Sequence, residues 1–252
     1  MFKVIAIAGK GGVGKTTLAA MLIRYLIEEV KASPILAVDA DPNSNLNELL
    51  GIEVHSTIGE IRELMKKDVP PGMTKDVWFE YKIHQAITEG EGFDLIAMGR
   101  PEGPGCYCAA NSLAKQSIEM LKKNYRYIVV DNEAGMEHMS RLVTQDVDYL
   151  FVVSDPTPRG LQTAGRIRGL IDELKLNIKN VHILVNRVKD GSEGRVVAEG
   201  EKKGIHIDNM IRDDDVLAEG DFDSEDVFRL DRSSLALGDA YRVFEKTIIK
   251  SS

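Results

Sequence analysis

The chain has 252 residues, a formal net charge of −8 and 43% hydrophobic residues. This length can bury one large core or two smaller ones, and the acidic balance argues against binding nucleic acid through a basic face. No apolar run reaches the roughly 18 residues of a membrane span, and the start, MFKVIAIAGK, lacks the regions of a signal peptide. We therefore expect a cytoplasmic protein that acts on neither membranes nor nucleic acid.

Aliphatic runs alternate with segments of helical periodicity along the chain. The predicted strands are 3–9, 35–41, 93–99, 126–132, 149–155, 181–187 and 205–211, mostly near-continuous apolar runs typical of strands covered on both faces. The predicted helices are 15–30, 57–67, 74–89, 110–123, 137–146, 159–175, 193–203 and 232–250. This rhythm predicts an α/β protein: a single doubly wound, mostly parallel sheet with helices on both faces. We expect one domain, 1–252, with a helical insertion around 51–92.

The first predicted strand runs into GKGGVGKTT, which fits the pattern G-x-x-x-x-G-K-[ST] between a strand and a helix. Glycines let the backbone point its N–H groups at phosphate oxygens, and the following helix adds the positive end of its dipole. Lys15 should neutralise the β- and γ-phosphates of a nucleotide, and the Thr16 hydroxyl should bind Mg²⁺. The predicted nucleotide contacts in this loop are Gly9, Lys10, Gly11, Gly12, Val13, Gly14, Lys15, Thr16 and Thr17.

Carboxylates end the second and fourth predicted strands, at the sheet edge where ligands of parallel sheets bind. Asp39 and Asp41 end the second; one can contact the water shell of the metal and the other can orient the attacking water. Helix capping is a competing interpretation here, above all for Asn43. Asp131 can hold Mg²⁺ through water, and the Gly135 N–H in DNEAG is a candidate sensor of the γ-phosphate.

Asn186 follows the aliphatic run of the sixth predicted strand, in ILVNRV. A side-chain amide presents both a donor and an acceptor, which suits the edge of adenine. A purely structural role in a turn is an equal alternative for this residue.

Both cysteines of the chain, Cys106 and Cys108, lie in GPGCYCAAN after the third predicted strand. In a reducing compartment such a pair more often binds metal or is redox-active, and a disulfide across one residue would be strained. Two thiols in an extended segment can point to one side. A structural Zn²⁺ site wants about four ligands, and a two-fold axis through this loop would supply them from two copies. Inert small residues, an iron–sulfur cluster and a redox pair are the alternatives.

The lysine at position 10 gives the loop KGGVGKTT a resemblance to the deviant phosphate loop of the MinD/ParA/nitrogenase-iron-protein group of ATPases. In that group the extra lysine reaches across a two-fold dimer to the partner's nucleotide. The resemblance covers essentially the whole chain and implies a homodimer formed with ATP. It implies that Lys10 acts across the dimer and that Asp41 places the hydrolytic water, and it makes 131–135 the second switch segment.

Within that group, the stretches VDADPNS, CYCAANS and EAGMEHMSR are similar to CooC-type ATPases, accessory proteins of nickel-dependent carbon monoxide dehydrogenase. This resemblance implies ATP-dependent delivery of Ni²⁺ to the nickel–iron–sulfur cluster of that enzyme or to the related acetyl-CoA synthase. Cys106 and Cys108 of two subunits would hold the nickel, or zinc in vitro. An iron–sulfur cluster like that of nitrogenase iron protein fits poorly, because DNEAGMEHM contains no cysteine. The alternative function is a MinD/ParA-like positioning ATPase that acts on membrane or DNA.

Overall fold

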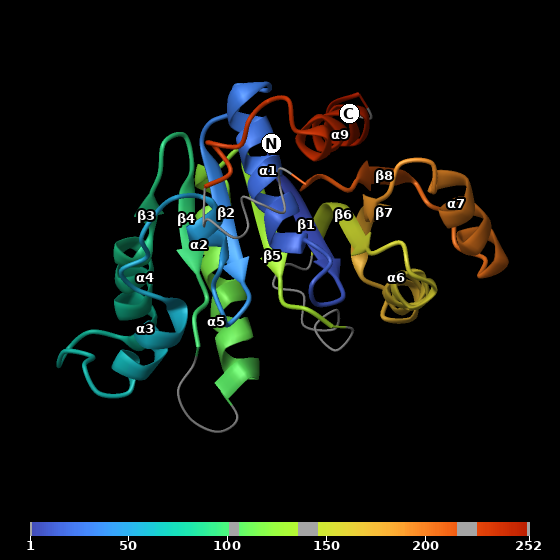
Figure 1. The fold of residues 1–252 in the computed structure, drawn as a ribbon. Coiled ribbons are helices and arrows are strands. Elements are labelled where there is room, and N and C mark those ends of the chain that lie inside the picture. Colours follow the sequence, from blue (N-terminus) through green and yellow to red (C-terminus); the bar gives the residue numbers. More distant parts are fainter. Residues whose placement is uncertain (1, 101–105, 136–145, 216–225, 251–252) are drawn as a thin grey trace.

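A single eight-stranded sheet forms the centre of the molecule (Figure 1). The computed structural model describes residues 2–100, 106–135, 146–215 and 226–250, and the side chains of 106–110 are not among those described. The strand order is β3-β4-β2-β5-β1-β6-β7-β8. The strands are β1 (Lys3–Gly9), β2 (Ile35–Ala40), β3 (Thr88–Glu89), β4 (Asp94–Ala97), β5 (Tyr127–Asn132), β6 (Asp146–Ser154), β7 (Asn177–Val188) and β8 (Asn209–Arg212).

All the strand pairs from β4 to β8 are parallel, and the edge strand β3 pairs antiparallel with β4. The predicted fold class is therefore confirmed, and each predicted strand overlaps an observed one. β3 was not predicted, because two residues are too few to leave a periodic pattern in the sequence.

Helices cover both faces of the sheet. They are α1 (Lys15–Glu28), α2 (Leu46–Leu49), α3 (Ile58–Met65), α4 (Lys75–Ala86), α5 (Cys106–Leu121), α6 (Pro158–Glu173), α7 (Glu193–Lys202) and α9 (Leu235–Phe244), with a 3₁₀ turn at Lys122–Asn124 and a π-helical turn at Glu245–Ile249. Thr57, Thr74, Thr157 and Ser234 start helices by accepting a backbone N–H in the first turn. The predicted helix 137–146 falls almost entirely outside the described residues.

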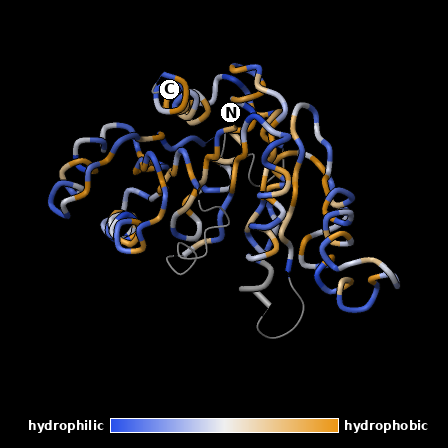
Figure 2. Tube along the Cα trace, turned by 180° about the vertical axis from the view of Figure 1, so that it is seen from behind, coloured by the Kyte–Doolittle hydropathy of each residue, from blue (hydrophilic) through white to orange (hydrophobic). Residues whose placement is uncertain are grey.

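Alternation along the strands divides the buried side chains into two cores. On β1, Val4, Ala6 and Ala8 belong to the core shared with α3 to α7, and Ile5 and Ile7 face α1 and α9. Figure 2 shows the hydrophobic residues running along the central strands. Within the described chain, no helix is long and apolar enough to cross a membrane.

The segment predicted as a helical insertion holds α3, α4 and β3, at one edge of the sheet (Figure 1). Trp78 and Phe79 of α4 are buried in the core of that face, whereas Tyr81 is 55% exposed. Helices α3 and α4 pack on each other and on α5. The insertion therefore supports the helix that begins at Cys106.

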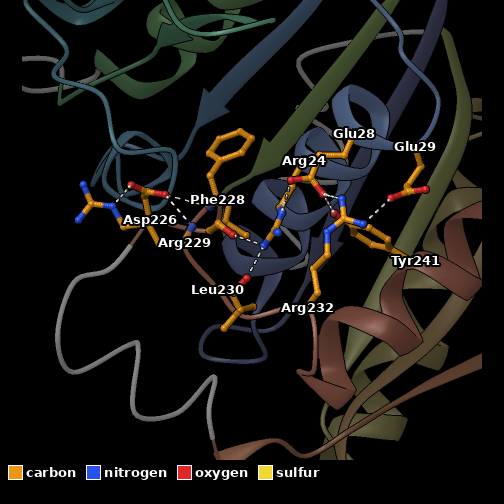
Figure 3. Close-up of polar contacts among 10 residues, drawn as sticks. Arg24, Glu28, Glu29, Asp226, Phe228, Arg229, Leu230, Arg232 and Tyr241 are labelled. Carbon is orange, nitrogen blue, oxygen red and sulfur yellow. Dashed lines mark hydrogen bonds and ion pairs between the residues drawn. The ribbon is translucent and has the colours of Figure 1, made fainter.

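Residues near the C-terminus are fastened to α1, the helix that starts at the phosphate loop (Figure 3). The Arg24 guanidinium is buried and donates to the carbonyl oxygens of Val227 and Leu230, at 2.7 and 2.8 Å, and to Glu28 at 2.9 Å. Arg232 approaches Glu28 from the surface, at 2.8 Å. This buried cation, bonded to two carbonyl groups and one carboxylate, holds α1 and the 226–232 segment together.

Candidate functional site

The loop after β1 has a backbone that only glycine accommodates at three places. Gly9, Gly12 and Gly14 have φ of 154°, 78° and 87°, in the region that L side chains rarely adopt. A Cβ on Gly9 would lie 2.3 Å from the Val153 carbonyl oxygen, and a Cβ on Gly14 would lie 2.6 Å from Asn186 Nδ2. The loop is thus a tightly fitted turn whose successive N–H groups can bind an anion.

Lys15 is the first residue of α1 and is only 7% exposed. Its Nζ donates to the Lys10 carbonyl oxygen at 3.4 Å, so the side chain curls back along the loop. Burial lowers the pKa of Lys15, and the charges of Asp131, Asp41 and Glu133 oppose that shift. A partly desolvated ammonium held against the loop is suited to phosphate oxygens. Thr16 and Thr17 follow it in the first turn and are half-buried.

Asp131 carries an unsatisfied buried oxygen. It is the next-to-last residue of β5, beside Asp39 of β2, and among the residues that the structure describes no group bonds its Oδ1. Burial raises its pKa to about 6, although the Thr16 hydroxyl donates to its carboxylate. An orphaned carboxylate oxygen next to a threonine hydroxyl at the phosphate loop is a donor set that Mg²⁺ accepts. The residues present therefore fit Mg²⁺.

Asp39 organises the chain that follows β2. Its Oδ1 accepts the Asp41 N–H and its Oδ2 accepts the Leu46 N–H, both at 3.0 Å. Burial is the largest cause that raises its pKa, to about 7, and neighbouring Asp131 adds to it. Because both oxygens are occupied, Asp39 shapes the segment that presents Asp41; its own contact with the water shell of a metal stays a prediction.

Asp41 is half-buried at the start of a compact turn. Its carboxylate accepts the Asn43 N–H at 2.8 Å and its carbonyl accepts the Ser44 N–H at 3.0 Å. Helix α2 begins instead after Asn45, whose side chain makes no capping bond. Asn43 therefore does not cap α2, and the capping alternative is wrong for this residue.

Lys10 projects from the loop toward the surface. Its side chain is 45% exposed, and its Nζ lies 3.9 Å from Asp155 Oδ2, just beyond β6. The contact with Asp155 was not predicted, although YLFVVSD also ends a strand on this rim. The Lys10 ammonium thus pairs with Asp155, and breaking this solvated ion pair costs little free energy.

Gly135 and Asn186, two further predicted contacts, bond to the loop itself. The Gly135 N–H donates to the Gly9 carbonyl oxygen at 3.3 Å, with φ of 120° at Gly135. The buried Asn186 amide donates to the Val13 carbonyl oxygen and accepts the Arg187 N–H, both at 3.0 Å. Asn186 therefore has a structural role, because its amide fixes the phosphate loop at Val13. A contact of Asn186 with adenine and the sensing of phosphate by Gly135 stay predictions.

Cys106 and Cys108 lie in the first turn of α5, which follows β4 in the chain. The helix was predicted to begin at residue 110, with the cysteines in an extended segment. That expectation is wrong for the backbone, because the helix already includes both positions. Their side chains lie outside those that the structure describes, so the thiolate site stays a prediction. Among the side chains that are described, no three His, Cys, Asp or Glu residues gather to hold a metal ion.

A strand, a glycine loop with a buried lysine, and a strand-end aspartate beside a threonine hydroxyl define a P-loop nucleotide-binding protein. The chain belongs to the CobQ/CobB/MinD/ParA nucleotide-binding domain family, whose model matches residues 4–227. Proteins of this family are generally ATPases, and the MinD/ParA members typically dimerise.

Relatives with identities above 30% include the following two. An uncharacterised ATP-binding protein of Methanocaldococcus jannaschii is 40% identical over 252 residues, covering 98% of this chain and 99% of the relative. The carbon monoxide dehydrogenase accessory protein CooC of Rhodospirillum rubrum is 32% identical over 198 residues, covering 73% and 74%.

Among solved structures, MinD of Pyrococcus horikoshii complexed with Mg-ADP matches with a TM-score of 0.72 at 21% identity, covering 100% of this chain and 98% of that one. A ParA family ATPase from Chlorobium tepidum matches with a TM-score of 0.73 at 21% identity, covering 96% and 98%. These structures establish the fold.

Proposed function

We propose that the protein is an ATP-hydrolysing metallochaperone. In this proposal it dimerises with ATP and delivers Ni²⁺ to the nickel–iron–sulfur cluster of carbon monoxide dehydrogenase, or to the related acetyl-CoA synthase. The observation that carries the proposal is the position of Cys106-Tyr-Cys108 at the start of α5, which follows β4 in the sheet that also carries the phosphate loop. The 32% identity to a carbon monoxide dehydrogenase accessory protein supports the choice of client.

The loop residues bind and orient ATP. Lys15, already curled against the loop, neutralises the β- and γ-phosphates, and Asp41 at the head of its turn orients the attacking water. Mg²⁺, when bound by Thr16 and Asp131, neutralises further phosphate charge. Lys10, at the surface, reaches the nucleotide of a second copy, so two nucleotides and two lysines favour a closed dimer. Water then displaces ADP from the γ-phosphate, and inorganic phosphate leaves.

The cargo site is formed by both copies. Cys106 and Cys108 supply two thiolates, and a two-fold axis adds the same pair from the partner. Thiolates suit soft and borderline ions, so Zn²⁺ should compete with Ni²⁺ in vitro. Hydrolysis removes the contacts that favour the closed dimer. The four-thiolate site then opens, and metal affinity falls because the two states differ in their affinity for the ion.

Equilibrium dialysis with Ni²⁺ tests the cargo site. The proposal predicts about one ion per two chains with a non-hydrolysable ATP analogue, and loss of that ion in Cys106→Ser, Cys108→Ser. A matched control is Ser112→Ala, which changes another small polar residue of α5 and should bind nickel as the wild type does. Nickel binding that survives in the cysteine variant would refute the proposal.

Activation of a client tests delivery. Nickel-loaded protein with ATP should activate nickel-free carbon monoxide dehydrogenase, and Lys10→Ala should not. The competing function is a positioning ATPase, favoured by the 26% identity over 257 residues to MinD of Bacillus subtilis. ATP-dependent binding to liposomes or DNA, without activation of the client, would decide for that alternative.

A further inference from the structure

Residues 98–100 connect the nucleotide site to the surroundings of the cysteine helix. They continue β4 beyond its last paired residue, and the Met98 N–H donates to the Asp39 carbonyl oxygen at 2.8 Å. Asp39 is the buried carboxylate beside Asp131. Residues 98–100 are therefore bonded directly to β2, the strand that leads into the turn of Asp41, Asn43 and Ser44, called here the catalytic turn.

Two further contacts join this segment to the turn after β2. The Gly99 N–H donates to Ser44 Oγ at 3.2 Å, and the Arg100 guanidinium donates to the Asn43 side-chain carbonyl. Ser44 Oγ in turn donates to the Asp41 carbonyl oxygen at 3.2 Å. Because Asp41, Asn43 and Ser44 are bonded to one another, a displacement of Asp41 displaces the groups that hold 99–100.

The other side of the segment rests on the start of α3. The Gly59 N–H donates to the Met98 carbonyl oxygen at 2.8 Å. Gly99 has φ of 64°, and a Cβ there would lie 2.5 Å from the Thr57 side chain, which caps α3. Helix α3 packs on α5. The segment is thus confined between the catalytic turn and a helix that supports the cysteine helix.

We propose that Asn43, Ser44 and Arg100 are positioning residues that transmit the nucleotide state from the Asp41 turn to the first turn of α5. Asp41 adjusts to the γ-phosphate, its turn moves as a unit, and the bonds to Gly99 and Arg100 carry the movement to the start of α3, the helix that packs on α5. The consequence for metal release rests on the proposed function, but the movement itself does not. Coupling of this kind is reciprocal, so metal on the cysteines would also change nucleotide affinity.

The two cysteines provide a probe, because the chain has no others. Metal-free protein is alkylated with iodoacetamide in the presence of Mg-ADP or Mg-AMP-PNP. All variants carry Lys10→Ala, so that a closed dimer does not shield the thiols and any effect travels within one chain. In this background we expect the two nucleotides to change the alkylation rate by about fivefold relative to one another, the lower end of usual couplings.

Removing the contacts of Asn43, Ser44 or Arg100 should make the alkylation rate nearly the same with the two nucleotides. Asn43→Ala, Arg100→Ala and their double variant should each bring the ratio of the two rates to within about twofold of unity, without additivity, because they break one contact. Asn43→Asp keeps the acceptor and adds a charge opposite Arg100, so it should preserve the ratio. Ser44→Gly removes the hydroxyl at a position whose φ is 49° and should reduce it too. AMP-PNP affinity should stay within twofold in every variant.

Two results would overturn this proposal. One is an equal alkylation rate with both nucleotides in the Lys10→Ala background, and the other is an unchanged fivefold difference after Asn43→Ala and Arg100→Ala. The proposed function fails on a different result, namely nickel binding that does not need Cys106 and Cys108.

Discussion

Lys10 Nζ lies 3.9 Å from Asp155 Oδ2, and the two side chains are 45% and 26% exposed. The lysine assigned to the partner's nucleotide therefore has a partner within its own chain. The pair is solvated and long, so it is worth at most about 1 kcal/mol. In the proposed dimer, Lys10 leaves Asp155 when a second copy offers phosphate oxygens, so the pair with Asp155 opposes closure of that dimer by a small amount.

Neutralising Asp155 should favour the dimer. Asp155→Asn keeps an oxygen to accept the Thr157 N–H, bonded at 2.9 Å, and removes only the charge. Each dimer breaks two such pairs, so with a non-hydrolysable ATP analogue its dissociation constant should fall by up to about thirtyfold in sedimentation velocity runs. Lys10→Ala should remain monomeric in the same runs. A tighter dimer in the presence of ADP as well would contradict this explanation, since ADP offers no γ-phosphate to Lys10.

Gly14 and Asn186 should act as a fitted pair. Gly14→Ala places a Cβ at a φ of 87° and 2.6 Å from Asn186 Nδ2, so ATP affinity should fall at least about tenfold. Asn186→Ala leaves the Val13 carbonyl without its bond and should destabilise the fold by about 1–3 kcal/mol. Adding Asn186→Ala to Gly14→Ala removes the contact but not the backbone strain. Calorimetric titration with ATP should therefore show partial recovery at most; complete recovery would mean that φ does not limit this position.

The buried carboxylates should make stability depend on pH. Burial raises the pKa of Asp131 to about 6 and that of Asp39 to about 7, so the folded chain holds more protons than the unfolded chain from about pH 4 to 7. The free energy of unfolding should therefore fall as pH rises through that window. Asp131→Asn should reduce this loss by about 1–2 kcal/mol in urea unfolding at pH 5 and pH 8. Equal losses in the variant and the wild type would show that Asp131 titrates normally.

Arg24 should matter far more for stability than Arg232, although both contact Glu28 (Figure 3). Arg24→Ala leaves the buried carbonyl of Val227 and the partly buried carbonyl of Leu230 without their donor, and it should cost about 3 kcal/mol or more. Arg232 is 66% exposed, and Arg232→Ala should cost at most about 1 kcal/mol. Thermal unfolding of both variants checks this. Similar losses would mean that the surface pair, not the buried cation, fastens the 226–232 segment.

Much of the fold was predictable because aliphatic strands covered on both faces leave long apolar runs in the sequence. The phosphate loop was predictable because its glycines and lysine have fixed spacing. The start of α5 was not, since Gly-Pro-Gly before Cys106 favours an open loop and only tertiary packing decides where the helix begins. The structural role of Asn186 and the contact of Lys10 with Asp155 depend on residues over a hundred positions apart, which spacing cannot reveal.

Native mass spectrometry of the protein trapped with a non-hydrolysable ATP analogue and Ni²⁺ tests whether two copies share one ion through their cysteines. We expect a dimer whose mass includes two nucleotides and one metal ion, and a metal-free dimer for Cys106→Ser, Cys108→Ser. One ion on each monomer, or an ion retained by the serine variant, would contradict it.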